Sequence, residues 1–159
     1  MAKKAYCRMQ LLSKLRYIGV RIEDLLDTYC LFIRSILEYS SVAFHSSLND
    51  RQTRKLESIQ VTALKICLRE NFVSANAARE MTGISLLSDR RELRCSKFAR
   101  QCILHPQHKD LFPLNPVHMY KTRTSEKYHV NHARTEFYKN SAVIYCQNLL
   151  NKLSREGKA

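Results

Sequence analysis

Apolar residues recur at helical spacing along most of this chain, and no stretch shows the alternation of a half-buried strand. Gly19 and Gly83 each follow such a stretch, at the left-handed position that commonly ends a helix. The sequence therefore predicts an all-α fold of about six helices in an irregular or orthogonal bundle. The expected helices cover residues 3–18, 22–46, 50–69, 75–82, 88–104 and 141–153.

The helices over 22–46 and 50–69 differ in their apolar pattern. The first is apolar almost all round, which predicts burial on most sides. The second is amphipathic, and its apolar stripe is Leu56, Ile59, Ala63 and Ile66. The turn between them carries short oxygen-bearing side chains that favour an N-cap, namely Ser46, Ser47, Asn49 and Asp50.

Two other helices have a predicted buried face. In the helix over 3–18 this face is Leu11, Leu15 and Ile18. In the helix over 88–104 it is Leu93, Phe98, Ala99 and Cys102. Ser88 is expected to cap this second helix, and His105-Pro106 to stop it.

Residues 113–139 show no helical or strand period, and they interleave cations with aromatic rings. A segment of this length is unusual inside a compact domain unless it binds something. Its cations suit phosphates and its rings suit unpaired bases, while the alternative is a loop whose tyrosines pin it to the helices. The expected organisation is a helical domain over 1–112, a basic loop or linker over 113–139, and a C-terminal helix and tail over 140–159.

Charge adds an expected partner to this picture. The 159 residues include 27 Lys and Arg against 14 Asp and Glu, which gives a net charge of +13 and a pI of about 9.7. An anionic partner such as nucleic acid fits this charge, although solubility alone also accounts for it. The hydrophobic content of 45% favours an ordered chain over a disordered one.

The six cysteines stand one by one in helical patterns, without a CxxC pair. There is no signal peptide and no run of 18 apolar residues. These features predict reduced, mostly buried thiols in an intracellular protein, nuclear or cytoplasmic, with no membrane partner.

Short motifs in a fixed order resemble the region after the palm in reverse transcriptases of jockey-like non-LTR retrotransposons. These motifs are Phe32-Ile33-Arg34, Leu37-Glu38-Tyr39, His45-Ser46-Ser47-Leu48, Leu56-Glu57, Ile59-Gln60, Ala63-Leu64-Lys65, Gly83, Leu87, Arg90-Arg91, Lys97-Phe98-Ala99, Cys102, His105-Pro106, Ala133-Arg134-Thr135, Tyr138, Ser141-Ala142 and Leu149-Leu150-Asn151. The resemblance covers nearly the whole chain. The chain departs from the family at Val42, Leu86 and Ile144, where the family often has proline, and at Phe44, where it has tryptophan.

The resemblance implies a thumb-like, noncatalytic part of an RNA-directed DNA polymerase that grips RNA or a template–primer duplex by its backbone. The palm would then be a partner, encoded upstream with the endonuclease, and the Mg²⁺ cofactor would belong to that palm. The residues agree, because polymerisation by two metals needs converging carboxylates and no Asp-Asp pair occurs here. Glu23 and Asp24 are neighbours on a helix and point apart.

Cys102, His105 and His108 offer zinc-ligand types, but Pro106 breaks the helix between the histidines. A core cysteine and a capping histidine explain them better, so no metal site, cofactor or small-molecule substrate is expected. Expected contacts to nucleic acid are Arg51, Arg54, Lys55, Arg90, Arg91, Arg94, Lys121, Arg123, Lys127, Arg134 and Lys139. Further cations outside the apolar stripes are Lys65, Arg69, Lys97 and Arg100. The alternatives are a helical protein-interaction module or a functionless relic of the transposon reading frame.

Overall fold

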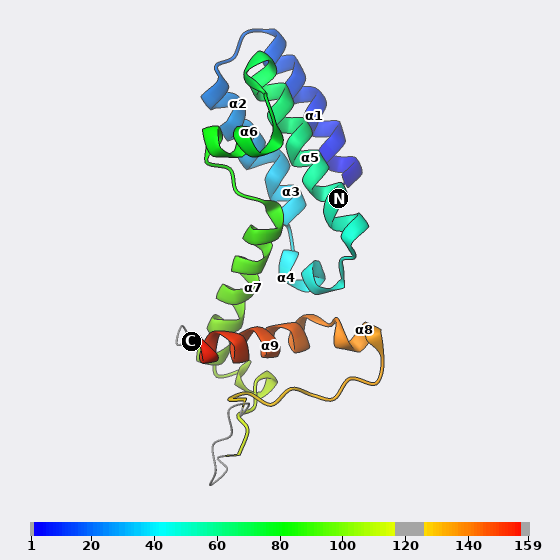
Figure 1. Ribbon diagram of the computed structural model, residues 1–159, viewed down its shortest axis with the longest axis vertical. Coiled ribbons are helices and arrows are strands. Elements are labelled where there is room, and N and C mark those ends of the chain that lie inside the picture. Colours follow the sequence, from blue (N-terminus) through cyan, green and yellow to red (C-terminus); the bar gives the residue numbers. More distant parts are fainter. Residues whose placement is uncertain (1, 117–125, 157–159) are drawn as a thin grey trace. The chain divides into compact units, whose positions relative to one another are not determined.

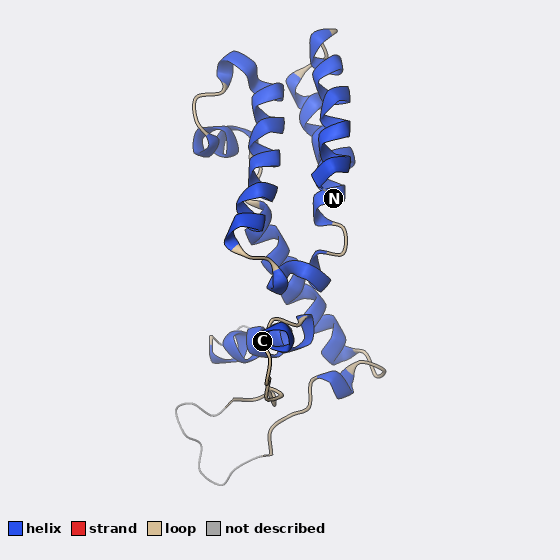
Figure 2. Ribbon diagram, turned by 90° about the vertical axis from the view of Figure 1, so that its right-hand side faces the viewer, coloured by secondary structure: helices blue, strands red, loops and turns tan. Residues whose placement is uncertain are grey.

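The computed structural model describes residues 2–116 and 126–156. The described residues are mostly helical and form no strand, only an isolated antiparallel bridge between Leu114 and Tyr128 (Figure 2). The all-α prediction is confirmed. There are more helices than the six expected, because the predicted helix over 22–46 is divided.

The chain forms two compact units. Unit 1 contains residues 1–41 and 48–91, and unit 2 contains residues 42–47 and 92–159. The expected boundaries after residues 112 and 139 both fall inside unit 2. The chain passes from one unit to the other within the short helix α4 (Ser41–Phe44), again after residue 47, and once more within α7 (Leu87–Leu104).

The helices of unit 1 are mostly those that the sequence predicts. They are α1 (Ala2–Tyr17), α2 (Ile22–Thr28), the π-helix η1 (Tyr29–Arg34), α3 (Ser35–Glu38), α5 (Asp50–Leu68), the 3₁₀ turn η3 (Arg69–Asn71) and α6 (Ala75–Thr82). α1 and α5 run side by side in the same direction (Figure 1). Asn49 caps α5 through a reciprocal capping box with Gln52, as the turn composition predicts.

α2, η1 and α3 form one helical run with a single buried row. Leu25, Tyr29, Ile33 and Leu37 are buried, each four residues after the last. A spacing of four drifts around an α-helix, and a π turn, which takes up more residues, corrects the drift. The expectation of burial on most sides is wrong, because Leu31 is 69% exposed on the opposite side of this run.

The expected helix over 22–46 ends early, at Glu38. Ser40 follows with a φ of 52°, a left-handed conformation that no helix continues through. Glu38 is buried and receives hydrogen bonds from Arg90 of α7, so a contact distant in sequence stands where the helix ends.

The predicted buried face of α1 is wrong. Leu11 and Ile18 are exposed, while Ala5, Met9 and Leu12 are buried. Both sets follow the same helical spacing, so periodicity alone does not distinguish them. Packing against α5 and the α2–α3 run determines which of the two sets is buried.

α7 also differs from its prediction at two points. Ala99 and Cys102 are buried as expected, but Leu93 and Phe98 are exposed. Ser88 does not cap the helix, because the Glu57 carboxylate of α5 accepts the N–H groups of Leu87 and Ser88 at 3.3 and 2.8 Å. A carboxylate is favourable there because helix N-termini carry positive partial charge.

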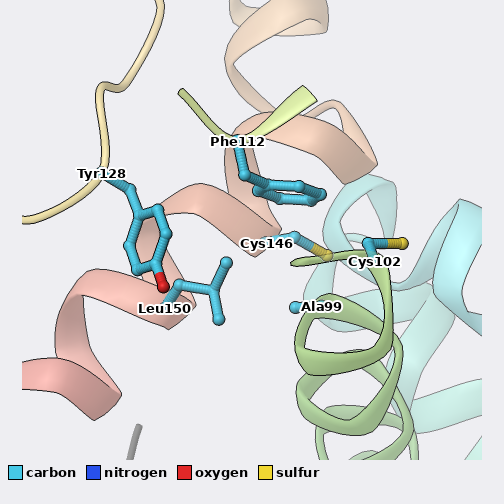
Figure 3. Close-up of a cluster of buried hydrophobic side chains, with 6 residues drawn as sticks. All are labelled: Ala99, Cys102, Phe112, Tyr128, Cys146 and Leu150. Atoms are coloured by element: carbon cyan, nitrogen blue, oxygen red, sulfur yellow. The ribbon is translucent and has the colours of Figure 1, made fainter. Parts of the chain in front are cut away.

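Unit 2 is built around α9 (Ala142–Arg155), with the 3₁₀ turns η2 (His45–Ser47) and η4 (Lys109–Leu111) and the short helix α8 (Glu136–Lys139). Its buried cluster joins α7 and α9 with Phe112 and Tyr128 of the connection between these helices (Figure 3). The members are Ala99, Cys102, Phe112, Tyr128, Cys146 and Leu150.

Candidate nucleic-acid interface

The exposed side of α5 carries a row of cations. Arg51, Lys55 and Lys65 recur at helical spacing, and Arg69 follows as the C-cap residue of the helix. All four are exposed, and we call them the α5 basic row. At 1.5 Å per residue, the row extends over ~27 Å. The helix turns its buried residues, among them Leu56, Ile59 and Ala63, to the core on its other side.

Uncharged side chains fill the middle of the row. Ser58 and Thr62 lie there, and their hydroxyls donate to the backbone oxygens of Lys55 and Ser58. At the C-terminal end, the Lys65 Nζ lies 5.3 Å from the centroid of the Phe72 ring. A cation over an aromatic face is attracted to it without losing its charge.

Among the described residues, none of the four cations of the row forms an ion pair with a carboxylate. Arg54 lies beside the row, where its Nε donates to the Asp50 backbone oxygen at 3.4 Å. The row therefore presents uncompensated positive charge to solvent, which suits the phosphates of a nucleic acid backbone.

The predicted contacts at the start of α7 are not part of an open surface. Arg90 donates from Nε and Nη2 to the two oxygens of the buried Glu38, and this hydrogen bonding raises the pKa of Arg90. Arg91 is only 1% exposed. Neither arginine is placed as the predicted contact with nucleic acid requires, because Arg90 pairs with Glu38 and Arg91 is buried. Arg94 is exposed.

The predicted contacts after residue 112 are mostly exposed where the structure describes them. Lys127, Arg134 and Lys139 are exposed, and Lys139 lies 3.5 Å from Glu136. Lys121 and Arg123 lie outside the described residues. Tyr128 is 4% exposed, so it does not offer its ring to a base. For this tyrosine the alternative reading is the better one, in which aromatic rings pin the segment to the helices.

The ends of this segment are joined at its base. Asn151 of α9 accepts the Tyr128 N–H at 2.8 Å and donates to the Tyr128 oxygen at 2.9 Å. On the other side, the Asn115 N–H donates to the Lys127 oxygen and the His129 N–H donates to the Pro113 oxygen. With Tyr128 turned inward, Lys127 and His129 are exposed on either side of it.

Sequence reasoning missed the hydrogen bonds by which Asn151 anchors this segment, and it missed the Glu57 cap. A polar Asn151 beside Leu149 and Leu150 was the available signal for the first, because a buried amide needs partners. The second had no local signal, since Glu57 and Ser88 are 31 positions apart.

The described residues contain no cluster of three potential metal ligands. Over the same residues, no helix has the length and apolar character needed to cross a membrane. None of the six cysteines forms a disulfide, and four of them are buried, as expected. Burial raises the pKa of Cys67 and of Cys146 to about 12.

Comparisons of the chain with models of known protein families, with curated proteins and with solved structures find no match.

Proposed function

We propose that this chain is a noncatalytic, thumb-like part of a reverse transcriptase similar to those of jockey-like non-LTR retrotransposons. In this role it holds RNA or an RNA–DNA duplex through backbone phosphates, without reading sequence. The α5 basic row is the observation that carries the binding part of the proposal. The order of the family-like motifs supports the retrotransposon part.

Binding by phosphate contacts has a defined dependence on salt. Each neutralised phosphate releases counterions, so the logarithm of affinity falls linearly with the logarithm of salt concentration, by about 0.7 to 0.9 per contact. We expect the chain to bind a labelled RNA–DNA hybrid of about 20 base pairs with such a slope between about 50 and 200 mM KCl. Fluorescence anisotropy measures it.

A matched pair of variants tests the row itself. Lys55→Gln/Lys65→Gln removes two row cations, while Lys3→Gln/Lys14→Gln removes two exposed cations of α1. The first should lower the salt slope by about 2, and the second should leave it nearly unchanged. Equal weakening by both pairs would indicate attraction to net charge alone and would reject the row as the site.

The retrotransposon origin needs a separate test. Sequencing of the DNA upstream of the gene should find a reading frame for the palm, with its metal-binding aspartates. Purified alone, the chain should show no metal-dependent primer extension. Primer extension by the chain itself would contradict the noncatalytic assignment.

A protein-interaction module is the second candidate, and exposed apolar side chains of η1 and the turn after α3 favour it. Leu31 is 69% exposed, Phe32 52% and Tyr39 72%. Such a patch commonly marks a contact with protein. Size-exclusion chromatography distinguishes the two, because a monomer at high concentration argues against an absent apolar partner. A functionless relic would bind neither nucleic acid nor protein.

A further inference from the structure

The C-cap residue that follows α5 is an arginine, and its backbone adopts a conformation that favours glycine. Arg69 has a φ of 46° and a ψ of −110°. A side chain makes this region costly, because at this ψ the Cβ nearly eclipses the amide nitrogen of the next residue. The same combination is found at the first central position of type II′ turns, which glycine dominates.

Two other helices of unit 1 are followed by glycine at positive φ. Gly19 follows α1 with a φ of 87°, and Gly83 follows α6 with a φ of 65°. Ser40, after α3, and Arg69 are the non-glycine residues with positive φ among the described residues. At the end of α5, arginine thus occupies a position that glycine adopts more easily.

The turn itself has no use for an arginine side chain. The Arg69 N–H donates to the Lys65 oxygen, and the Phe72 N–H donates to the Arg69 oxygen at 3.0 Å. Both are backbone hydrogen bonds that glycine would make equally well. The Arg69 side chain is exposed, and it makes no ion pair with another described residue.

We propose that Arg69 is the terminal phosphate contact of the α5 basic row, and that its side chain serves this contact at the expense of the turn. The inference rests on the proposed function. A guanidinium suits the task because its planar fork donates two parallel hydrogen bonds to one phosphate. The competing explanation is that the cation stabilises the negative C-terminal end of α5. It predicts the opposite effect on stability.

Arg69→Gly separates these explanations, because it relaxes the backbone and removes the cation. We expect its Tm to rise by about 2–4 °C. We expect its affinity for the same RNA–DNA hybrid to fall about fivefold to tenfold, with the salt slope lowered by about 1. Arg69→Gln should lose the same affinity without the rise in Tm, because it keeps the strained side chain.

Ser40→Gly is the matched control, since Ser40 is the other non-glycine residue with positive φ among the described residues and lies outside the row. Its Tm should rise by a similar amount, while its affinity stays within about twofold. A lower Tm for Arg69→Gly, or an unchanged affinity, overturns the proposal.

The outcome for Lys55→Gln/Lys65→Gln distinguishes failure of this inference from failure of the proposed function. If that pair weakens binding and Arg69→Gly does not, only the role of Arg69 is rejected. If the wild-type chain does not bind the hybrid, both are rejected.

Discussion

Buried amides link segments that are distant in sequence in both units, and Gln60 and Asn151 each do so with two hydrogen bonds. Gln60 accepts from the Tyr29 hydroxyl at 2.8 Å and donates to the Ser85 oxygen at 2.9 Å. Asn151 pairs with both backbone groups of Tyr128, much as a neighbouring strand would. Because buried polar groups cost free energy when left unpaired, each amide fixes the position of its partners.

Asn151→Ala should destabilise unit 2 by about 1–3 kcal/mol, because it leaves the Tyr128 N–H without its acceptor and the Tyr128 oxygen with only the 3.4 Å hydrogen bond from Asn115. Urea unfolding measures the loss, and hydrogen exchange at the Tyr128 amide should become faster. Asn148→Ala on the exposed side of α9 is the control, with an expected change within about 0.5 kcal/mol. Continued protection of the Tyr128 amide would show that the side-chain pairing is dispensable.

The buried thiols predict a loss of stability in alkali. Cys67 and Cys146 titrate near pH 9 when unfolded, but burial raises their folded pKa to about 12. Between these values the unfolded chain releases protons that the folded chain retains, so stability present below pH 9 is lost as pH rises. Each thiol contributes a slope of up to about 1.4 kcal/mol per pH unit. Cys67→Ala should show a shallower decline in urea unfolding across pH 9–11 than Cys7→Ala, whose thiol is exposed.

At the scale of elements, α7 depends on a residue of another helix for its start. The Glu57 carboxylate replaces the local serine cap, so α5 and α7 are joined where α7 begins. The Arg90–Glu38 pair, one turn further along α7, joins it to α3. Both contacts lie within unit 1 and join the start of α7 to its other helices.

Glu57→Ala should cost about 1–2 kcal/mol, because it exposes the first N–H groups of α7 and removes a charge that favours the helix dipole. Glu57→Gln should cost less, since it keeps one acceptor oxygen. Circular dichroism during urea unfolding measures both variants. Glu80→Gln, on the exposed side of α6, should have little effect. A similar loss for Glu80→Gln would point to net charge as the cause.

Local signals explain which elements were predictable. The start of α5 was predictable from Asn49 and the end of α6 from Gly83, because capping acts within a few residues. The break at Ser40 was not predictable, because neither glycine nor proline marks it, and the contact beside it joins Glu38 to Arg90, 52 positions later. The prediction of the buried face of α1 was wrong for another reason. Two sets of apolar residues in this helix fit the same helical period.

In the candidate site, too, the features with a local sequence signal were predictable and those set by distant contacts were not. Cations on the exposed side of α5 were predictable from the helical period, since the apolar stripe fixes which side faces solvent. The sequence does not distinguish Arg90 from these exposed cations, because the partner of Arg90, Glu38, is distant in sequence. The conformation of Arg69 had no sequence signal, as glycine is the residue expected there.

At the scale of the whole molecule, α7 is shared by the two units. Its residues up to Arg91 belong to unit 1, and those from Glu92 belong to unit 2. A continuous helix transmits disorder from one unit to the other, because unfolding either unit removes the contacts of part of the helix. We therefore expect the two units to unfold together.

Glu92→Pro should uncouple them, since proline removes one helical hydrogen bond and clashes with the preceding turn, at about 3 kcal/mol. Hydrogen exchange should give α5 and α9 similar opening free energies in the wild type and different ones in the variant. Glu92→Ala keeps the helix and should keep the values together. Equal values in Glu92→Pro would mean that α7 is not the coupling element.

The placement of residues 42–47 in unit 2 has a consequence for biosynthesis. His45 pairs with Tyr145, 100 positions later, and the Ser46 hydroxyl donates to the Asn140 oxygen. At about 5–20 residues per second, a ribosome delivers those partners roughly 5–20 s after residues 42–47 emerge. During that interval the segment lacks its contacts with Asn140 and Tyr145, while the helices on both sides of it are already made. Residues 42–47 of the nascent chain therefore stay exposed until Asn140 and Tyr145 have been synthesised. We expect a chaperone to bind the chain during this interval.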